Sequence, residues 1–318
     1  MRTAPPVREG FEIVGEIRGA LSPRNDIGRM ERGMADLMEQ TGWQIAESGP
    51  DAYERYIVPA WMGGWARNLV TMAALSPGER VLELACGTGV VSREAGKVLG
   101  PAGEVTGVDR DRGMLRAART YAVAAGLDAI RWSEGDASHI PAASGSFDVV
   151  LCQQGLQFFP DRPGALREMA RVLRPGGRVL LSVWRSLDRC PVLSAVCGAL
   201  GRRFGARAEG VFHASCSLHD PDTLRSLLAG AGFDGIHIRL EARMARHPSL
   251  QTFLSGYLSV FPMAAEIAAL DDSDRASLFD GIIAELGPYR DDDGLAAPME
   301  AYVVAAHRGT GRRREAGT

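Results

Sequence analysis

The chain has 318 residues, of which 46% are hydrophobic and 24% are charged, and its formal net charge is −3. This composition is that of a globular protein with a sizeable core, and it argues against binding nucleic acid through bulk charge. No apolar run approaches the ~18 residues that a membrane-spanning helix needs, and Met1–Gly10 lacks the apolar centre of a signal peptide. The 5 cysteines form no C-x-x-C pair, so neither a disulfide framework nor a zinc ribbon is indicated. We therefore expect a cytoplasmic protein without a metal site.

Residues 1–74 are predicted to form an N-terminal helical segment. Residues 1–10 are expected to be frayed. Asp26 is suited to cap a helix whose apolar residues recur at helical spacing as far as Met38. An aromatic stretch, Tyr53–Trp65, follows after a polar break.

Short apolar runs then alternate with amphipathic stretches, which indicates βαβ units and a mostly parallel sheet. The predicted strands are Arg80–Leu84, Glu104–Val108, Ile130–Glu134, Phe147–Cys152, Arg178–Val183, Gly235–Leu240 and Ala301–His307. The predicted helices between them are Val90–Leu99, Gly113–Ala125, Pro163–Leu173 and Pro221–Ala231. Right-handed crossovers make such an α/β sheet doubly wound and Rossmann-like, with seven strands.

The pattern divides the chain into a nucleotide-binding type of domain and an insertion. Residues 75–245 are expected to form the Rossmann-like domain, and residues 301–308 supply the last strand of its sheet. Residues 246–300 are mostly helical in pattern and are too long for a simple loop, so we expect an inserted lid. The polar, arginine-rich tail at 309–318 is expected to be disordered.

A glycine-rich loop follows the first predicted strand, in the run Glu83-Leu84-Ala85-Cys86-Gly87-Thr88-Gly89. Small residues there let the chain turn sharply and let a ligand approach the backbone. Asp109 ends the second strand, where a carboxylate is placed to accept both hydroxyls of a ribose. Asp136 follows the third strand, and Leu173–Gly177 ends a helix before the fifth.

These motifs together resemble those of class I S-adenosylmethionine (SAM)-dependent methyltransferases, over the segment from about Leu75 to Trp184. More narrowly, they resemble the branch around the ubiquinone and menaquinone C-methyltransferases. The resemblance implies the class I methyltransferase fold, SAM as cofactor, and a set of residues around it. The implied cofactor-binding residues are Glu83, Ala85, Gly87, Gly89, Asp109, Arg110, Met114, Asp136, Ala137 and Gln153.

The methyl acceptor and its surroundings are less determined. Tyr53 and Tyr56 are candidates to close over the methionine moiety of SAM, and Tyr53 is also assigned to the acceptor. Gln157 and Phe158 follow the fourth strand, at the edge of the sheet where open α/β sheets have their crevice. The predicted lid contributes Tyr257 as a further acceptor-binding residue.

A phenolic acceptor would benefit from a neighbouring base, and histidine is the residue best suited to that task. His139 lies in the loop after Asp136, and His247 lies near the predicted lid, so both are candidate catalytic bases.

The predicted function is methyl transfer from SAM to a small-molecule metabolite, at carbon or oxygen. Two alternatives stay open: an RNA or protein methyltransferase, and a SAM-binding protein that catalyses a reaction other than methyl transfer. The acidic balance of the chain argues against the first alternative. The expected partners are therefore a small-molecule substrate, no nucleic acid and no membrane, and the chain could form a homodimer.

Overall fold

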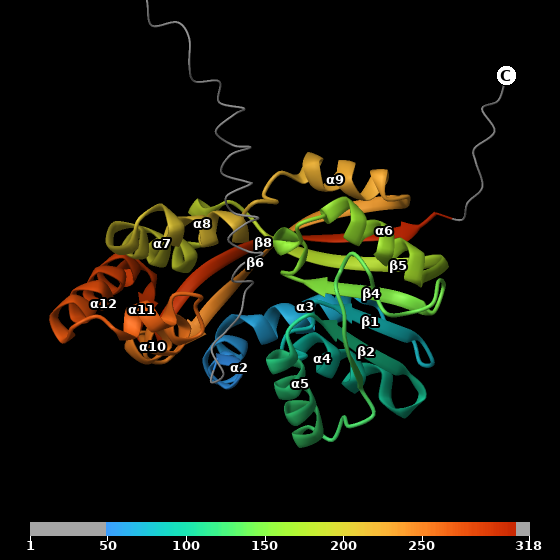
Figure 1. The fold of residues 1–318 in the computed structure, drawn as a ribbon, viewed down its shortest axis with the longest axis horizontal. Coiled ribbons are helices and arrows are strands. Elements are labelled where there is room, and N and C mark those ends of the chain that lie inside the picture. The colour runs from blue at the N-terminus through green and yellow to red at the C-terminus, as the bar shows by residue number, and fades with distance from the viewer. Residues whose placement is uncertain (1–48, 310–318) are drawn as a thin grey trace, which may run out of the picture.

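The computed structural model describes residues 49–309. The helix expected after Asp26, the first ten residues and nearly all of the 309–318 tail lie outside the described residues. Within the described range the strands form one sheet in the order β3-β2-β1-β4-β5-β8-β6, and β7 pairs with β8 (Figure 1). The strands are β1 (Arg80–Leu84), β2 (Glu104–Asp109), β3 (Arg131–Glu134), β4 (Phe147–Gln153), β5 (Leu173–Trp184), β6 (Phe233–His247), β7 (Arg290–Asp291) and β8 (Gly294–Arg308).

The strand order confirms the predicted doubly wound sheet. Strands β1 to β5 pair in parallel, whereas β8 runs antiparallel to β5, β6 and the short β7. The chain builds outward from β1 to β3 and then returns to place β4 on the other side of β1. A crevice is expected at such a reversal, outside the carboxyl ends of the strands.

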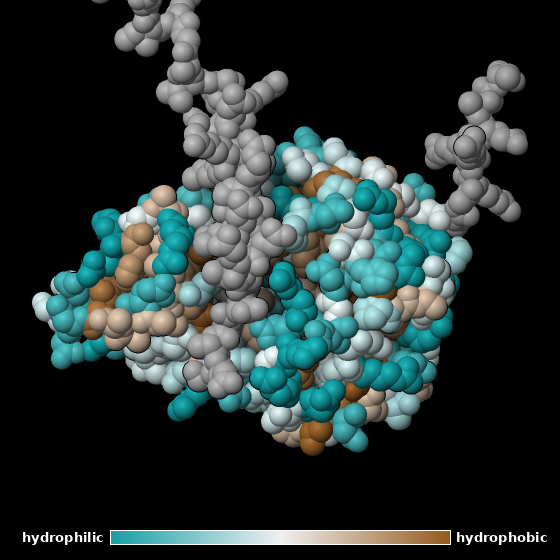
Figure 2. All heavy atoms as spheres, viewed as in Figure 1, coloured by the Kyte–Doolittle hydropathy of each residue, from teal (hydrophilic) through white to brown (hydrophobic). Residues whose placement is uncertain are grey.

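Helices cover both faces of the sheet, so side chains alternate along each strand between two buried cores. Val81 and Val149 point into the core under α3 and α4, whereas Leu82 and Val150 point into the core under α6 and α9. The covering helices are α3 (Gly63–Ala73), α4 (Val90–Leu99), α5 (Arg112–Ala124), α6 (Arg162–Val172) and α9 (Pro221–Gly230). Figure 2 shows a visible face on which hydrophilic residues predominate. No helix among residues 49–309 is both long and apolar enough to cross a membrane.

A continuous helical stretch precedes the sheet. It comprises α2 (Gly49–Ala52), the π-helix η1 (Tyr53–Met62) and α3, and the backbone stays helical through both junctions. π-Helical turns are rare and occur frequently at functional sites. The aromatic stretch of the sequence, Tyr53–Trp65, thus forms η1 and the start of α3.

A second group of helices lies together at one end of the sheet (Figure 1). It contains α7 (Pro191–Phe204), α8 (Ala206–Ser215), α10 (Leu250–Ser259), α11 (Ala264–Ala268) and α12 (Asp272–Leu286). The short 3₁₀ turns of the chain are η2 (Gly100–Ala102), η3 (Leu156–Phe158), η4 (Leu187–Arg189) and η5 (Gly287–Tyr289). We name the group α7, α8 and α10–α12 the helical cap.

The boundaries of the predicted insertion differ from those of the structure. The last strand begins at Gly294 and not at residue 301, and β6 continues to His247, where it pairs with Leu295. Residues from Leu295 to Val303 alternate between buried and partly exposed positions, which is the period of a strand. The sequence Ala-Ala-Pro-Met-Glu lacks β-branched residues, so its strand character was not evident from composition. The cap also includes α7 and α8, which the prediction had placed in the sheet domain.

Candidate functional site

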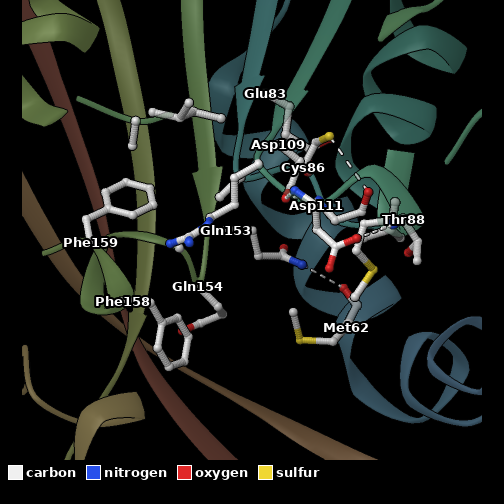
Figure 3. Close-up of a pocket in the computed structure, with 18 of the residues that line it drawn as sticks. Met62, Glu83, Cys86, Thr88, Asp109, Asp111, Gln153, Gln154, Phe158 and Phe159 are labelled. Carbon is white, nitrogen blue, oxygen red and sulfur yellow. Dashed lines mark hydrogen bonds between the residues drawn. The ribbon is translucent and has the colours of Figure 1, made fainter. Parts of the chain in front are cut away.

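A cavity of about 470 Å³ lies at the carboxyl ends of the central strands. Glu83 of β1, Asp109 of β2, Gln153 of β4 and Trp184 of β5 all line it. Figure 3 shows Glu83, Asp109 and Gln153 around one space. The cavity therefore occupies the position that the strand order predicts for a ligand.

The glycine-rich loop forms one wall of this cavity. Ala85, Gly87 and Gly89 all have a positive φ, of 55°, 51° and 77° respectively. Gly87 donates its amide hydrogen to Asp109 Oδ2 at 2.7 Å, and Gly89 donates to the Cys86 carbonyl at 2.8 Å. The loop thus turns from β1 into α4 with its backbone exposed to the cavity.

Gly89 itself does not line the cavity. It is needed for the turn into α4, where its φ is positive and Trp132 leaves no room for a side chain. A Cβ atom there would come within 2.3 Å of Trp132 Cη2, from β3. Gly89→Ala is expected to lower the free energy of unfolding by about 3 kcal/mol, through left-handed strain and overpacking together. Gly126→Ala is the matched control, because its φ is 70° and nothing lies within 4 Å. That control should lose only about 1 kcal/mol in chemical denaturation. Equal losses in the two variants would contradict a role for Trp132.

Asp109 is held by backbone amides on both of its carboxylate oxygens. Oδ2 accepts from Gly87, and Oδ1 accepts from the Asp111 amide at 2.9 Å. Burial raises the pKa of Asp109 above its ordinary value, and these amide hydrogen bonds oppose the rise. Each carboxylate oxygen retains a free lone pair. The fixed carboxylate can therefore accept two further hydrogen bonds, as from a vicinal diol.

Glu83 is the most deeply buried acid of the site, with 2% of its surface exposed. Its Oε2 accepts from the Ser92 amide at 2.7 Å and from Ser92 Oγ at 2.5 Å. Burial raises the pKa of Glu83 to about 8, against the lowering effect of these hydrogen bonds. An ammonium group in the cavity would reverse this shift, because an opposite charge favours the carboxylate.

Two buried polar atoms of lining residues lack a partner among residues 49–309. They are Gln153 Oε1 and Thr88 Oγ1. The Gln153 amide nitrogen donates to the Met62 carbonyl at 3.2 Å, so its oxygen is held in place. Buried polar groups are almost always satisfied in folded proteins. These two atoms therefore indicate a ligand with hydrogen-bonding groups.

The part of the cavity farther from the loop is apolar and aromatic. Trp61 packs edge-on against Tyr257, with ring centroids 5.4 Å apart. The lining residues that η1, the helical cap and the end of α10 supply are uncharged: Tyr53, Ile57, Trp61, Met62, Leu193, Ser215, Tyr257 and, directly after α10, Val260. This compartment favours an uncharged, largely apolar molecule.

Most of the predicted site residues line the one cavity. They are Glu83, Ala85, Gly87, Asp109, Arg110, Met114, Asp136, Ala137, Gln153, Tyr53, Phe158 and Tyr257. Asp136 Oδ1 accepts hydrogen bonds from the Ser138 hydroxyl at 2.6 Å and from the Ser138 amide at 2.8 Å. These bonds hold the pKa of Asp136 below its ordinary value.

Tyr56 and Gln157 lie outside the cavity, which corrects their assignments. Hydrogen bonds in a π-helix run from i to i+5, so residues four or five apart share a face. The cavity face of η1 holds Tyr53, Ile57 and Trp61, whereas Tyr56 packs against Gly256 of α10. Gln157 is 2% exposed and donates through Nε2 to Gln154 Oε1 at 3.0 Å, so Gln154 is the residue that lines the cavity.

The two candidate bases are also corrected, because no histidine among residues 49–309 lines the cavity. His139 is exposed, in a turn where its amide donates to the Asp136 carbonyl. His247 ends β6, and its Nδ1 accepts from the Ser249 amide at 3.1 Å. Its ring packs beside Phe253 at 5.8 Å, so it supports the start of α10.

Several lining residues were not predicted. Trp184 ends β5 one residue beyond the predicted strand, and its position at a carboxyl end was the signal available. Leu193 and Ser215 come from α7 and α8. No motif marks these helices, so only their packing in three dimensions brings them to the site.

The known proteins that this chain resembles are methyltransferases. Residues 81–177 match the family model described as a methyltransferase domain. The ubiquinone/menaquinone biosynthesis C-methyltransferase UbiE of Burkholderia vietnamiensis is 34% identical over 181 residues, which cover 54% of this chain and 74% of that protein. The 2-phytyl-1,4-naphtoquinone methyltransferase of Synechococcus elongatus is 40% identical over 119 residues, which cover 37% of this chain and 51% of that protein.

Solved structures agree in fold. A Haemonchus contortus phosphoethanolamine N-methyltransferase 2 structure, with S-adenosylhomocysteine bound, has a TM-score of 0.55 at 19% identity. The match covers 87% of this chain and 60% of that one. The YcgJ protein from Bacillus subtilis has a TM-score of 0.53 at 19% identity, covering 78% of this chain and 100% of that one.

Proposed function

Because this chain belongs to the class I SAM-dependent methyltransferases of the ubiquinone/menaquinone C-methyltransferase branch, we propose that it methylates a carbon atom of an uncharged, apolar small molecule. One observation supports this acceptor best: η1 and the helical cap contribute no charged side chain to the compartment that lies between them. The relatives named above act on quinones by their names, so a reduced, prenylated quinone ring is the acceptor class we propose.

The cavity fits SAM on two observations. The carboxylate of Asp109, at the end of β2, can accept further hydrogen bonds. The buried atoms Gln153 Oε1 and Thr88 Oγ1 have no hydrogen-bond partner among the described residues, so a ligand can supply one. We propose that Asp109 holds the ribose and that Glu83 and Gln153 hold the methionine end, with Ala85 and Gly87 as the loop floor. Arg110, Met114, Asp136 and Ala137 would surround the adenine. When bound, SAM supplies a methyl group activated by a positive sulfonium.

The chain's own contribution to the reaction is orientation and exclusion of water. Aromatic side chains from η1 and α10 enclose the acceptor compartment. We propose that these side chains form the cover of the site. Holding two reactants in line can supply effective molarities of about 10⁵ M or more. No histidine among the described residues lines the cavity, so the proton that an electron-rich ring carbon loses on methylation is expected to leave through another group or water.

An acceptor panel tests the proposal. The purified protein is incubated with SAM and either a short-chain prenylated naphthoquinol or phosphoethanolamine, and S-adenosylhomocysteine is measured by mass spectrometry. Turnover with the quinol alone is the expected result. Turnover with phosphoethanolamine alone would contradict the proposed acceptor class, and binding of SAM without any turnover across a wider panel would favour a reaction other than methyl transfer.

The pKa of Glu83 predicts pH-dependent cofactor binding. Since that pKa is about 8 without ligand, Glu83 holds a proton at pH 6 and must release it to face the ligand's ammonium group. The affinity for S-adenosylhomocysteine should therefore rise with pH up to about 8, by up to about ten-fold per unit. The raised pKa also means that the unliganded fold loses stability as the pH rises toward 8.

Titration calorimetry at pH 6 and pH 8, in buffers of different ionisation enthalpy, measures both the affinity and the released proton. Glu83→Gln is the matched variant, because it cannot release a proton and should bind with little pH dependence. A wild-type affinity that is flat between pH 6 and pH 8 would show that Glu83 does not change its charge on binding.

A cytoplasmic location, the absence of a nucleic-acid partner and a homodimer stay predictions. Sedimentation of the purified protein, with and without S-adenosylhomocysteine, tests the homodimer directly.

A further inference from the structure

A buried ion pair joins the N-terminal helix to the first helix of the sheet domain. Arg93 of α4 donates through Nη2 to both carboxylate oxygens of Glu54 in η1, at 2.7 and 2.9 Å. Only 10% of the Arg93 side chain and 7% of the Glu54 side chain are exposed. Neither residue lines the cavity, and neither is among the predicted site residues.

The other arm of the same guanidinium reaches the glycine-rich loop. Arg93 Nη1 donates to the Thr88 carbonyl at 2.6 Å. One side chain therefore bridges the glycine-rich loop and the helix η1, both of which line the cavity. Tyr121 of α5 supports this bridge, because its ring lies 5.7 Å from the Arg93 guanidinium carbon and its hydroxyl donates to Asp51 at 3.1 Å.

The residues that η1 presents to the cavity depend on this attachment. Tyr53 precedes Glu54 directly and lines the cavity, as do Ile57 and Trp61 on the same face of η1. At the far end of η1, the Met62 carbonyl accepts from the Gln153 amide. The helix is thus fixed to the cofactor half of the site at both of its ends.

Stability alone is a weak reason for a charged pair in this position. Removing two ions from water is costly, and apolar residues of similar volume often stabilise a fold as well or better. A guanidinium with a fork of donors does what an apolar residue cannot: it fixes two backbone segments in a defined geometry.

We infer that Arg93 and Glu54 are positioning residues, which couple cofactor binding at the glycine-rich loop to the placement of η1 over the site. The inference rests on the proposed use of this cavity for SAM. Coupling between two elements is reciprocal. A cofactor that orders the loop therefore also favours the attachment of η1 through Arg93, and a detached η1 weakens cofactor binding.

Glu54→Gln tests the coupling, because glutamine keeps the shape of the side chain and removes the charge. We expect the affinity for S-adenosylhomocysteine, measured by calorimetry, to fall about ten-fold, with a matching rise in the KM for SAM and a smaller change in kcat. Glu79→Gln is the matched control. Glu79 forms a bidentate pair with Arg178 at 2.7 and 2.8 Å, with 14% and 21% of the side chains exposed, and neither residue lines the cavity.

The control should lower the thermal midpoint and leave the cofactor affinity unchanged. The double variant Glu54→Gln/Arg93→Gln leaves no unpaired buried charge, so it should recover stability relative to Glu54→Gln. It should nevertheless keep the weak affinity, because the bridge is still missing. An affinity that stays at the wild-type value in Glu54→Gln, or that follows stability through all of these variants, would overturn the inference.

Hydrogen exchange of the wild-type protein provides a second test that needs no variant to fold. Addition of S-adenosylhomocysteine should protect residues 49–62 together with residues 85–93. Protection confined to residues 85–93 would overturn the coupling, while a wild-type protein that does not bind S-adenosylhomocysteine would instead contradict the proposed function.

Discussion

Asp109→Ala is expected to weaken binding of S-adenosylhomocysteine by about 3 kcal/mol or more, a factor of at least about 100. The variant removes the two charge-assisted hydrogen bonds that we propose between Asp109 and the ribose. It also leaves the Gly87 and Asp111 amides without their acceptor, so the glycine-rich loop loses its anchor. Calorimetry on the purified variant measures the loss.

Glu104→Ala is the matched control for this variant. Glu104 begins the same strand that Asp109 ends, and it pairs with Arg131 in a site where both side chains are more than half exposed. The control should bind the cofactor as the wild type does. Asp109→Asn keeps the shape of the side chain and separates the charge from the packing. If both Asp109 variants bound S-adenosylhomocysteine with the wild-type affinity, the assignment of Asp109 to the cofactor site would be contradicted.

Tyr257→Ala is expected to raise the KM for the acceptor by about 30-fold, or about 2 kcal/mol, at unchanged cofactor affinity. Tyr257 is 5% exposed, lines the cavity from α10 and packs against Trp61. Its removal opens the acceptor compartment to water, and it leaves the loop and Asp109 untouched. Steady-state kinetics against the acceptor, with calorimetry for S-adenosylhomocysteine, separate the two sites.

Phe253→Leu controls for the loss of packing in the cap. Phe253 stacks on Tyr257 at 5.8 Å and is fully buried, but it does not line the cavity. It should lower the thermal midpoint and leave the acceptor KM near the wild-type value. If Tyr257→Ala is too unstable to assay, Tyr257→Leu retains more of the buried volume. Equal effects of Tyr257 and Phe253 variants on acceptor KM would contradict a direct acceptor contact.

The sheet and the cofactor half of the site could be predicted because their signals are local. The parallel strands of a doubly wound sheet end at the same edge, so Glu83 and Asp109 were expected to lie near one another, and the family resemblance added Gln153. The glycine-rich loop needs its small residues for backbone reasons that a sequence displays directly.

The acceptor half could not be predicted in the same way, because it is assembled from helices far apart in the chain. The sequence alone does not distinguish Tyr53 from Tyr56 as a residue of the site. The π-helical geometry of η1 directs Tyr53 to the cavity and Tyr56 to α10. His247 was a candidate base from sequence, but it lies at the end of β6, where its Nδ1 accepts a hydrogen bond from the Ser249 amide. Helical periodicity could not indicate that α7 joins α10 in the cap.

The atom of the acceptor that receives the methyl group distinguishes the proposed C-methylation from transfer to oxygen or nitrogen. NMR of the product formed from methyl-¹³C-labelled SAM and a prenylated naphthoquinol identifies that atom. We expect a labelled methyl group bonded to carbon, with one S-adenosylhomocysteine formed for each product. A label bonded to oxygen or nitrogen, or a product formed without S-adenosylhomocysteine, would contradict it.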